Sequence, residues 1–110
     1  MFEQMEITVA ETAKLLSTDS PPLLIDCREE NEHEFCRIEG AILVPLSDFA
    51  GKAEALLKHS EEAAIIYCHH GVRSLHAAHY LHQQGYTNTL SMHGGIEAWS
   101  LKINAGIPRY

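Results

Sequence analysis

Short apolar runs alternate along the chain with segments whose apolar residues recur at helical spacing. Five such runs predict strands, over residues 5–7, 23–25, 41–44, 63–67 and 89–92. The segments between them predict helices that start near residues 8, 47, 74 and 96, and a helical turn over residues 31–35. The run over residues 63–67 is almost continuously apolar, which is typical of a strand covered on both faces.

The predicted helices have recognisable ends and faces. Thr8 and Glu11 form a capping-box pattern, and Ser47 is a candidate cap for the helix that follows it. Gly85 is expected to stop the helix over residues 74–84. The residues expected on buried helix faces are Ala10, Ala13 and Leu16 in the first helix, Phe49, Ala53, Leu56 and Leu57 in the second, and Leu75, Ala78 and Leu81 in the third.

Strands that alternate with helices predict an α/β fold, a parallel sheet with helices on both faces. In open sheets of this kind, ligands bind beyond the carboxyl ends of the strands. Cys68 directly follows the most apolar of the predicted strands. The sequence Cys68-His69-His70-Gly71-Val72-Arg73-Ser74 is therefore the leading candidate for a functional loop.

Composition narrows the class of protein. With 110 residues, 45% of them hydrophobic, the chain is expected to form one domain over residues 1–110. A formal net charge of -7 argues against nucleic acid or an anionic membrane surface as partner. No apolar run approaches the roughly 20 residues of a membrane helix, and the first residues lack a signal-like apolar core. Three cysteines, an odd number, favour free thiols in the cytoplasm.

The Cys68 loop combines three features that activate a thiol. A cysteine at the start of a helix faces unpaired N–H groups and the positive end of the helix dipole, and both favour the thiolate. Arg73 adds a permanent positive charge, and Gly71 allows the backbone to curl with a positive φ. The curled backbone is expected to gather N–H groups into an anion-binding nest.

The spacing between Cys68 and Arg73 bears on the reaction. Four residues separate them, whereas cysteine phosphatases, which resemble this arrangement, use five and thereby form a wider cradle around phosphate. The shorter loop suits a compact adduct such as one terminal sulfur atom. We therefore rank persulfide chemistry above phosphate ester hydrolysis.

These elements resemble the rhodanese-like family along nearly the whole chain and in the family's order. CHHGVRS is similar to the active loop of that family, and Asp26-Cys27-Arg28-Glu29 is similar to its D-x-R-E element. The stretch over residues 35–41 resembles its F-x-x-G-H-I-x-G-A pattern, with Cys36-Arg37 in place of Gly-His. Gly85-Tyr86 and Gly94-Gly95-Ile96-Glu97-Ala98-Trp99 resemble its G-[FY] and G-G-x-x-A-W patterns.

The resemblance implies a three-layer α/β/α domain whose five parallel strands are in the order 3-2-4-5-1. It also implies a sulfurtransferase in which Cys68 takes a sulfane sulfur from thiosulfate or a persulfide donor. The Cys68 persulfide would pass this sulfur to cyanide, a thiol or a partner protein, without a metal or an organic cofactor. The residues expected to bind the anion are His69, His70, Gly71, Val72, Arg73 and Ser74, with Asp26 and Arg28 as an ion pair that supports the loop.

Two other functions remain open at this point. One is a non-catalytic or redox-sensing interaction module, and the weaker one is a cysteine phosphatase or arsenate-reductase-like enzyme. Of the other cysteines, Cys27 is expected to be packed or inert. Cys36 is expected to be structural or incidental, and the alternative is a redox role in which it accepts sulfur from Cys68 or forms a disulfide with it. The acidic residues 29–34 are expected to form a solvated helix face, as are His76, His79 and His82, and Trp99 is expected to anchor the core.

Overall fold

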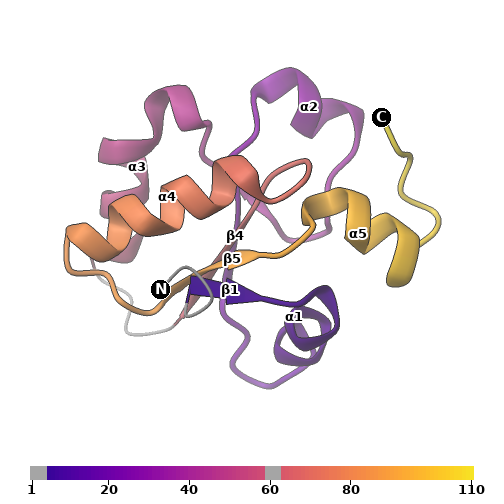
Figure 1. Ribbon diagram of the computed structural model, residues 1–110, viewed down its shortest axis with the longest axis horizontal. Helices are drawn as coiled ribbons and strands as arrows, with labels where there is room; N and C mark the ends of the chain where they lie inside the picture. The colour runs from indigo at the N-terminus through magenta and orange to yellow at the C-terminus, as the bar shows by residue number, and fades with distance from the viewer. Residues whose placement is uncertain (1–4, 59–62) are drawn as a thin grey trace.

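The computed structural model describes residues 5–58 and 63–110, so the expected domain span of 1–110 includes short segments outside the described residues. All strand pairs are parallel, and the sheet order is β1-β5-β4-β2-β3. This order is 3-2-4-5-1 read from the other edge, which confirms the predicted topology. Figure 1 shows β5 between β1 and β4. The strands are β1 (Glu6–Ile7), β2 (Leu23–Asp26), β3 (Ile42–Leu43), β4 (Ala64–Tyr67) and β5 (Thr89–Met92).

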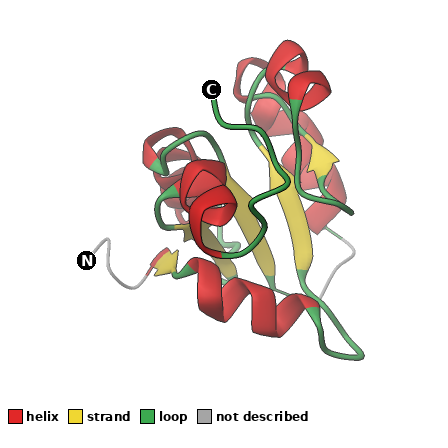
Figure 2. Ribbon diagram, turned by 90° about the vertical axis from the view of Figure 1, so that its right-hand side faces the viewer, coloured by secondary structure: helices red, strands yellow, loops and turns green. Residues whose placement is uncertain are grey.

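Helices cover both faces of the sheet, as Figure 2 shows. α3 and α4 pack on one face, and α1 and α5 pack on the other. The helices are α1 (Val9–Leu16), α2 (Glu30–Phe35), α3 (Phe49–Leu57), α4 (Val72–Gln83) and α5 (Gly95–Lys102), with a 3-10 turn, η2 (Leu46–Asp48), before α3. The predicted α/β/α layers are thus confirmed. Within the described residues, none of the helices is long and apolar enough to cross a bilayer.

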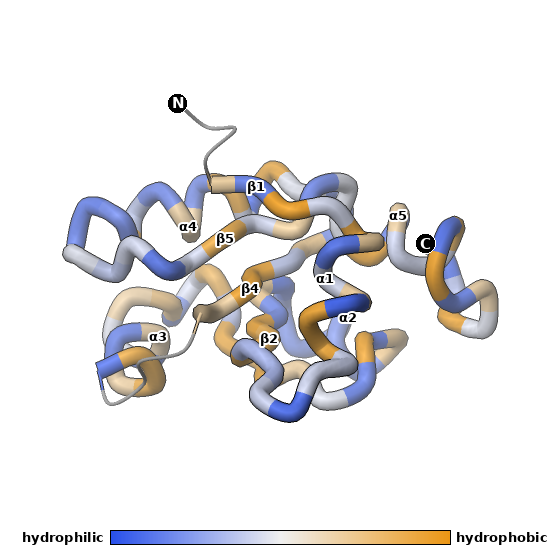
Figure 3. The backbone as a smooth tube through the Cα atoms, turned by 90° about the horizontal axis from the view of Figure 1, so that it is seen from below, coloured by the Kyte–Doolittle hydropathy of each residue, from blue (hydrophilic) through white to orange (hydrophobic). Residues whose placement is uncertain are grey.

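The two central strands divide the core into two layers. β2 and β4 pair so that Leu24 lies beside Ile65 and Ile25 lies beside Ile66. Since side chains alternate along a strand, the first pair packs under α1 and α5 and the second under α3 and α4. Every residue of β4 is buried, as the apolar run predicted, and Figure 3 shows these hydrophobic strands in the middle of the molecule.

The first helix begins as predicted, and Ala13 and Leu16 pack against the core as expected, but Ala10 does not. The Thr8 hydroxyl accepts from the Glu11 N–H, and the Glu11 carboxylate accepts from the Thr8 N–H, each at 3.1 Å, which completes the capping box. α1 buries Val9 and Thr12, whereas Ala10 is exposed, so the expectation for Ala10 is wrong. The buried residues are thus the first residue of the helix and the residue three positions later, which lie on one face.

Two other helix starts differ from the prediction. Ser47 lies inside the 3-10 turn, and its hydroxyl donates to Glu29 at 3.0 Å, so it does not cap α3. α4 starts at Val72 rather than at residue 74, because Gly71 has a φ of 98° and turns the chain directly into the helix. Ala78 and Leu81 face the core as expected, whereas Leu75 is half-buried.

Candidate active site

Cys68 lies at the centre of the sheet's carboxyl edge, where β4 ends. Its residue surface is 1% exposed. The chain leaves the strand, curls at Gly71 in the left-handed conformation and enters α4 at once. The sulfur therefore sits inside the curl, in front of the helix.

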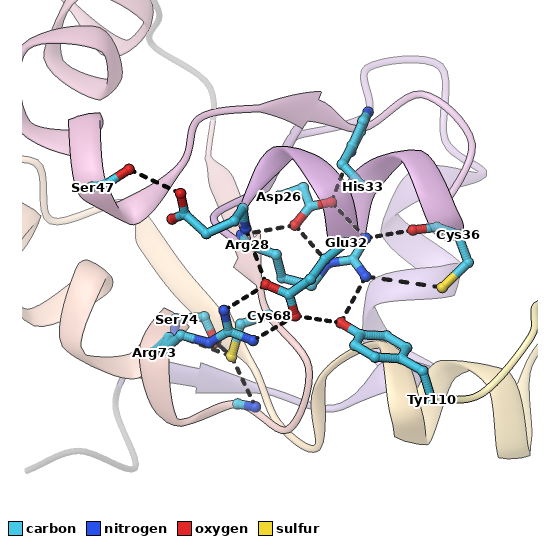
Figure 4. A network of polar contacts seen from close by, with 12 residues as sticks. Asp26, Arg28, Glu32, His33, Cys36, Ser47, Cys68, Arg73, Ser74 and Tyr110 are labelled. Atoms are coloured by element: carbon cyan, nitrogen blue, oxygen red, sulfur yellow. Dashed lines mark hydrogen bonds and ion pairs between the residues drawn. The ribbon is translucent and has the colours of Figure 1, made fainter.

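Four polar groups converge on or near the Cys68 sulfur. The backbone N–H groups of Gly71 and Ser74 donate to Sγ at 3.1 and 3.3 Å. The Ser74 hydroxyl lies 3.5 Å from Sγ and 2.7 Å from the hydroxyl of Ser91 on β5. When Cys68 is a thiolate, Ser74 can donate to the sulfur while it accepts from Ser91. Figure 4 shows Cys68, Arg73 and Ser74 together at this loop.

These contacts make Cys68 strongly acidic for a thiol. The pKa of Cys68 is lowered to about 4, first by a hydrogen bond from the Cys27 thiol and then by the side chain and backbone of Ser74 and the backbone of Gly71. Burial acts in the opposite direction, because it favours the neutral thiol. The donors outweigh burial, so Cys68 is a thiolate at neutral pH. The same hydrogen bond raises the pKa of Cys27.

The loop is held against the start of α5. The Ile96 N–H donates to the Cys68 carbonyl at 2.9 Å, and the Glu97 N–H donates to the His69 carbonyl at 3.1 Å. These are two of the N–H groups that a helix leaves unpaired in its first turn. A Cβ atom at Gly95 would collide with both carbonyl groups, so only glycine allows this approach.

Arg73 forms an ion pair with Glu32, a residue that was expected to lie on a solvated helix face. Its Nη1 and Nη2 atoms lie 2.8 and 3.0 Å from the two carboxylate oxygens of Glu32 on α2. Glu32 also accepts from the Tyr110 hydroxyl at 2.7 Å. The hydrogen bond from Arg73 is the main reason that the pKa of Glu32 falls to about 2. The expectation of a solvated acidic face is thus wrong for Glu32, which neutralises the one cation of the loop.

Asp26 and Arg28 form the expected ion pair, and both are fully buried. Arg28 Nε and Nη2 donate to the two oxygens of Asp26 at 2.9 and 2.7 Å. Arg28 Nη2 also donates to the Cys36 carbonyl at 2.6 Å, and the Tyr67 hydroxyl donates to Asp26 at 3.2 Å. The pair therefore fixes the residue that precedes Cys68 together with the start of the 36–41 segment.

The remaining loop residues line the outer side of the site. The His69 ring is stacked between His70 and Tyr110, with centroid distances of 3.9 and 3.8 Å. Burial, and then the charge of His70, lowers the pKa of His69, so that ring is neutral at pH 7. Val72 projects outward and is 65% exposed.

The helix histidines do not form one solvated row. His76 is exposed, but the Nε2 atom of His82 lies 2.7 Å from the Thr89 carbonyl on β5, so the expectation for His82 is wrong. Among residues 5–58 and 63–110, no three histidine, cysteine or acidic side chains are grouped so as to hold a metal ion. Trp99 is buried in the core as expected.

Sequence reasoning missed the roles of four residues around the Cys68 loop, namely Cys27, Glu32, Ser91 and Tyr110. A signal existed for Cys27, since the order 3-2-4-5-1 places the second and fourth strands side by side and Cys27 and Cys68 follow their ends. Tyr110 and Glu32 gave no such signal, because they approach the loop from distant parts of the chain. The structure therefore places three further groups beside the predicted loop. They are the Cys27 thiol, the Glu32 carboxylate and the Ser91 hydroxyl, which is hydrogen-bonded to Ser74.

Comparisons with known proteins agree with this architecture. Residues 8–102 match the model of the rhodanese-like domain family. The thiosulfate sulfurtransferase GlpE of Pseudoalteromonas translucida is 30% identical over 103 residues, which cover 94% of this chain and 95% of that protein. The solved structure of a rhodanese-related protein from Thermoplasma volcanium has a TM-score of 0.76 and 29% identity, with 94% of each chain covered.

Longer proteins contain a similar segment. Rhodanese-like/PpiC domain-containing protein 12, chloroplastic, of Arabidopsis thaliana is 36% identical over 89 residues, which cover 79% of this chain and 30% of that protein. This chain likewise spans about a quarter of the length of several further curated relatives. The predicted resemblance is confirmed, and the chain belongs to the rhodanese-like domain family, which includes proteins named as sulfurtransferases.

Proposed function

We propose that this protein is a sulfurtransferase that carries a sulfane sulfur on Cys68 as a persulfide. The observation that carries the proposal is the Cys68 sulfur itself, a buried thiolate with backbone N–H donors of Gly71 and Ser74 at 3.1 and 3.3 Å. Neutral N–H groups that converge on one small anion stabilise it without a metal. The same donors would serve an outer sulfur atom held just above Sγ.

The reaction consists of two displacements. The Cys68 thiolate attacks the outer sulfur of the donor, an S–S bond forms, and the donor's former S–S bond breaks. With thiosulfate the leaving group is sulfite, and with a persulfide it is the donor thiolate. An acceptor nucleophile then attacks the outer sulfur and leaves Cys68 as a thiolate, so no net oxidation of the protein occurs.

The charges around the loop favour a persulfide over thiosulfate as the donor. Glu32 pairs with Arg73, and the lowered pKa of His69 keeps its ring neutral, so the loop offers little uncompensated positive charge. Thiosulfate carries two negative charges, whereas a deprotonated alkyl persulfide carries one. A site of this kind attracts the dianion weakly.

The rim of the loop supports a thiol or a protein acceptor more than free cyanide. Val72 is 65% exposed and Phe35, which packs edge-on against Tyr110, is 57% exposed. Exposed apolar side chains beside a reactive sulfur suit the apolar contact surface of a larger partner.

Intact-mass measurement tests the proposal directly. The reduced protein is incubated with thiosulfate or with glutathione persulfide, and the mass is read before and after addition of cyanide or a thiol. We expect the gain of one sulfur atom on Cys68 and its loss to the acceptor. Cys36→Ser should load sulfur as the natural chain does, whereas Cys68→Ser should not. Persistent loading of Cys68→Ser would overturn the proposal.

A further inference from the structure

A second thiol lies beside Cys68 at the same edge of the sheet. Asp26 and Tyr67 are register partners at the ends of the parallel strands β2 and β4, and the Cys27 N–H donates to the Tyr67 carbonyl at 3.0 Å. Cys27 and Cys68 are the next residues on each strand, and both side chains enter the same core cluster under α3 and α4. The two cysteines are therefore lateral neighbours on one face.

The spacing of the strands brings this pair within disulfide range. Neighbouring strands lie about 4.7–4.9 Å apart. Disulfides need Cα atoms about 4.4–6.8 Å apart with both Cβ atoms on the same side. The two side chains lie close enough that the Cys27 thiol is the largest influence that lowers the pKa of Cys68. Closing the S–S bond thus needs a side-chain rotation rather than a movement of the sheet.

The two thiols are both buried but differ in protonation. Cys27 keeps its proton, because the hydrogen bond to the neighbouring thiolate and burial both raise its pKa. Cys68 carries the negative charge and faces the loop. Because the thiolate is the form that reacts, an oxidant attacks Cys68 first, and Cys27 is oxidised only through Cys68.

We propose that Cys27 is a resolving cysteine, which forms a disulfide with Cys68 after a hydroperoxide has oxidised Cys68. In the first step the Cys68 thiolate takes an oxygen atom from the hydroperoxide and becomes a sulfenic acid, while the hydroperoxide is reduced to water or an alcohol. In the second step Cys27 attacks Cys68 Sγ, the S–O bond breaks, and one water leaves with the Cys27 proton. The disulfide stops oxidation before the irreversible sulfinic acid forms, and a dithiol reductant restores both thiols.

The third cysteine does not share this geometry. Cys36 lies in the core cluster on the opposite face of the sheet, where its sulfur is 3.9 Å from Arg28 Nη1. The sheet therefore separates Cys36 from Cys68, which lies in the cluster on the other face. Cys36 is therefore the matched control for Cys27.

Stepwise oxidation tests the proposal. The reduced protein is treated with about one equivalent of hydrogen peroxide, with and without dimedone, and the intact mass and the linked peptides are measured. We expect the natural chain to lose two hydrogen atoms, to link Cys27 with Cys68, and to recover both thiols with dithiothreitol. Cys36→Ser should behave in the same way.

The variants at position 27 separate the disulfide from the hydrogen bond. Cys27→Ser keeps a hydroxyl donor for the thiolate but has no sulfur, so its Cys68 sulfenic acid should be trapped as the dimedone adduct when dimedone is present. Without dimedone, it should go on to the sulfinic acid when more peroxide is added. Cys27→Ala should give the same products, because it also has no sulfur at position 27 to form the disulfide. A Cys68 that goes to the sulfinic acid in the natural chain, or a disulfide that persists in Cys27→Ser, would overturn the proposal.

The proposed disulfide between Cys27 and Cys68 does not depend on sulfur transfer, and the two can be tested separately. It requires a thiolate at Cys68 and a thiol beside it, whereas sulfur transfer requires a donor and an acceptor. Sulfur loading from glutathione persulfide is measured on protein that has never met peroxide. Failure of loading with normal disulfide formation would reject the sulfurtransferase alone, and the reverse result would reject the resolving cysteine alone.

Discussion

The carboxyl edge of β2 and β4 presents two faces of opposite character. On one face, Asp26 and Tyr67 join Arg28 in a closed network of buried charges and hydroxyls. On the other face, one residue further along each strand, Cys27 and Cys68 lie in an apolar cluster with a single negative charge. A shift of one residue therefore separates a structural site from a reactive one.

The difference lies in how each charge is compensated. Asp26 is met by the opposite charge of Arg28, and hydrogen bonds from Arg28 and His33 lower its pKa although burial alone would raise it. The Cys68 thiolate is met by neutral donors of Cys27, Ser74 and Gly71. A full ion pair leaves no net charge for a ligand, whereas neutral donors stabilise an anion that is still able to react.

The largest expected effect is at the reactive face. Cys68→Ser removes the nucleophile, so sulfur loading and turnover should be abolished while the free energy of unfolding changes by less than about 1 kcal/mol. Intact mass after persulfide treatment and urea unfolding measure the two quantities. A large loss of stability with residual loading would mean that the two faces are not separate in function.

The next effect is at the structural face. Arg28→Met leaves Asp26 buried without its partner, and breaking a buried ion pair costs about 3–5 kcal/mol of stability. Urea unfolding measures this loss. Arg109→Ala, which breaks an exposed ion pair with Glu97, is the matched control and should cost less than about 1 kcal/mol. Equal losses in the two variants would refute a special role for the buried pair.

A third effect is on the acidity of Cys68. Its pKa is depressed to about 4, so the thiolate is present above that pH and alkylation by iodoacetamide should fall only as the pH drops through it. Cys27→Ala removes a hydrogen bond to a charged group, worth about 1.5–3 kcal/mol. The midpoint of the alkylation profile should therefore move up by roughly one to two pH units.

The control for that shift is Cys27→Ser, which retains a donor and should move the midpoint less. An unchanged profile in Cys27→Ala would mean that the backbone N–H groups of Gly71 and Ser74 alone hold the thiolate. The pH profile would then separate the contribution of the loop from that of the neighbouring strand.

The smallest expected effect concerns the ion pair between Arg73 and Glu32 at the Cys68 loop. Glu32→Gln frees Arg73, so the KM for thiosulfate should fall by about fivefold, which corresponds to roughly 1 kcal/mol for a partly exposed ion pair. The KM for the less charged persulfide should change less. Glu30→Gln removes an exposed charge from the same helix and serves as the control.

Arg73→Ala provides the opposite change. It should raise the KM for thiosulfate and cost less than about 1 kcal/mol of stability, because the Arg73 side chain is 36% exposed. If Arg73→Ala lowered stability as much as turnover, Arg73 would be a structural residue rather than a donor-binding one.

The fold was predictable because its signals are local. The run over residues 63–67, the capping box at Thr8 and the glycine at position 71 each specify a strand, a helix start or a curl through the residues themselves. The predictions failed at Ala10 and Ser47, where the helix phase and a preceding 3-10 turn depend on how the helix docks. Docking depends on packing against residues far away in the sequence.

The sequence by itself determined the parallel sheet, the place of Cys68 and the curl that turns N–H groups toward its sulfur. Only the tertiary structure decided that Cys27 touches Cys68, that Glu32 neutralises Arg73 and that Tyr110 covers His69. The first group follows from the spacing of residues along a few turns of chain. The second follows from the register of strands and from contacts between residues 41 positions apart in the sequence, which a local pattern does not encode.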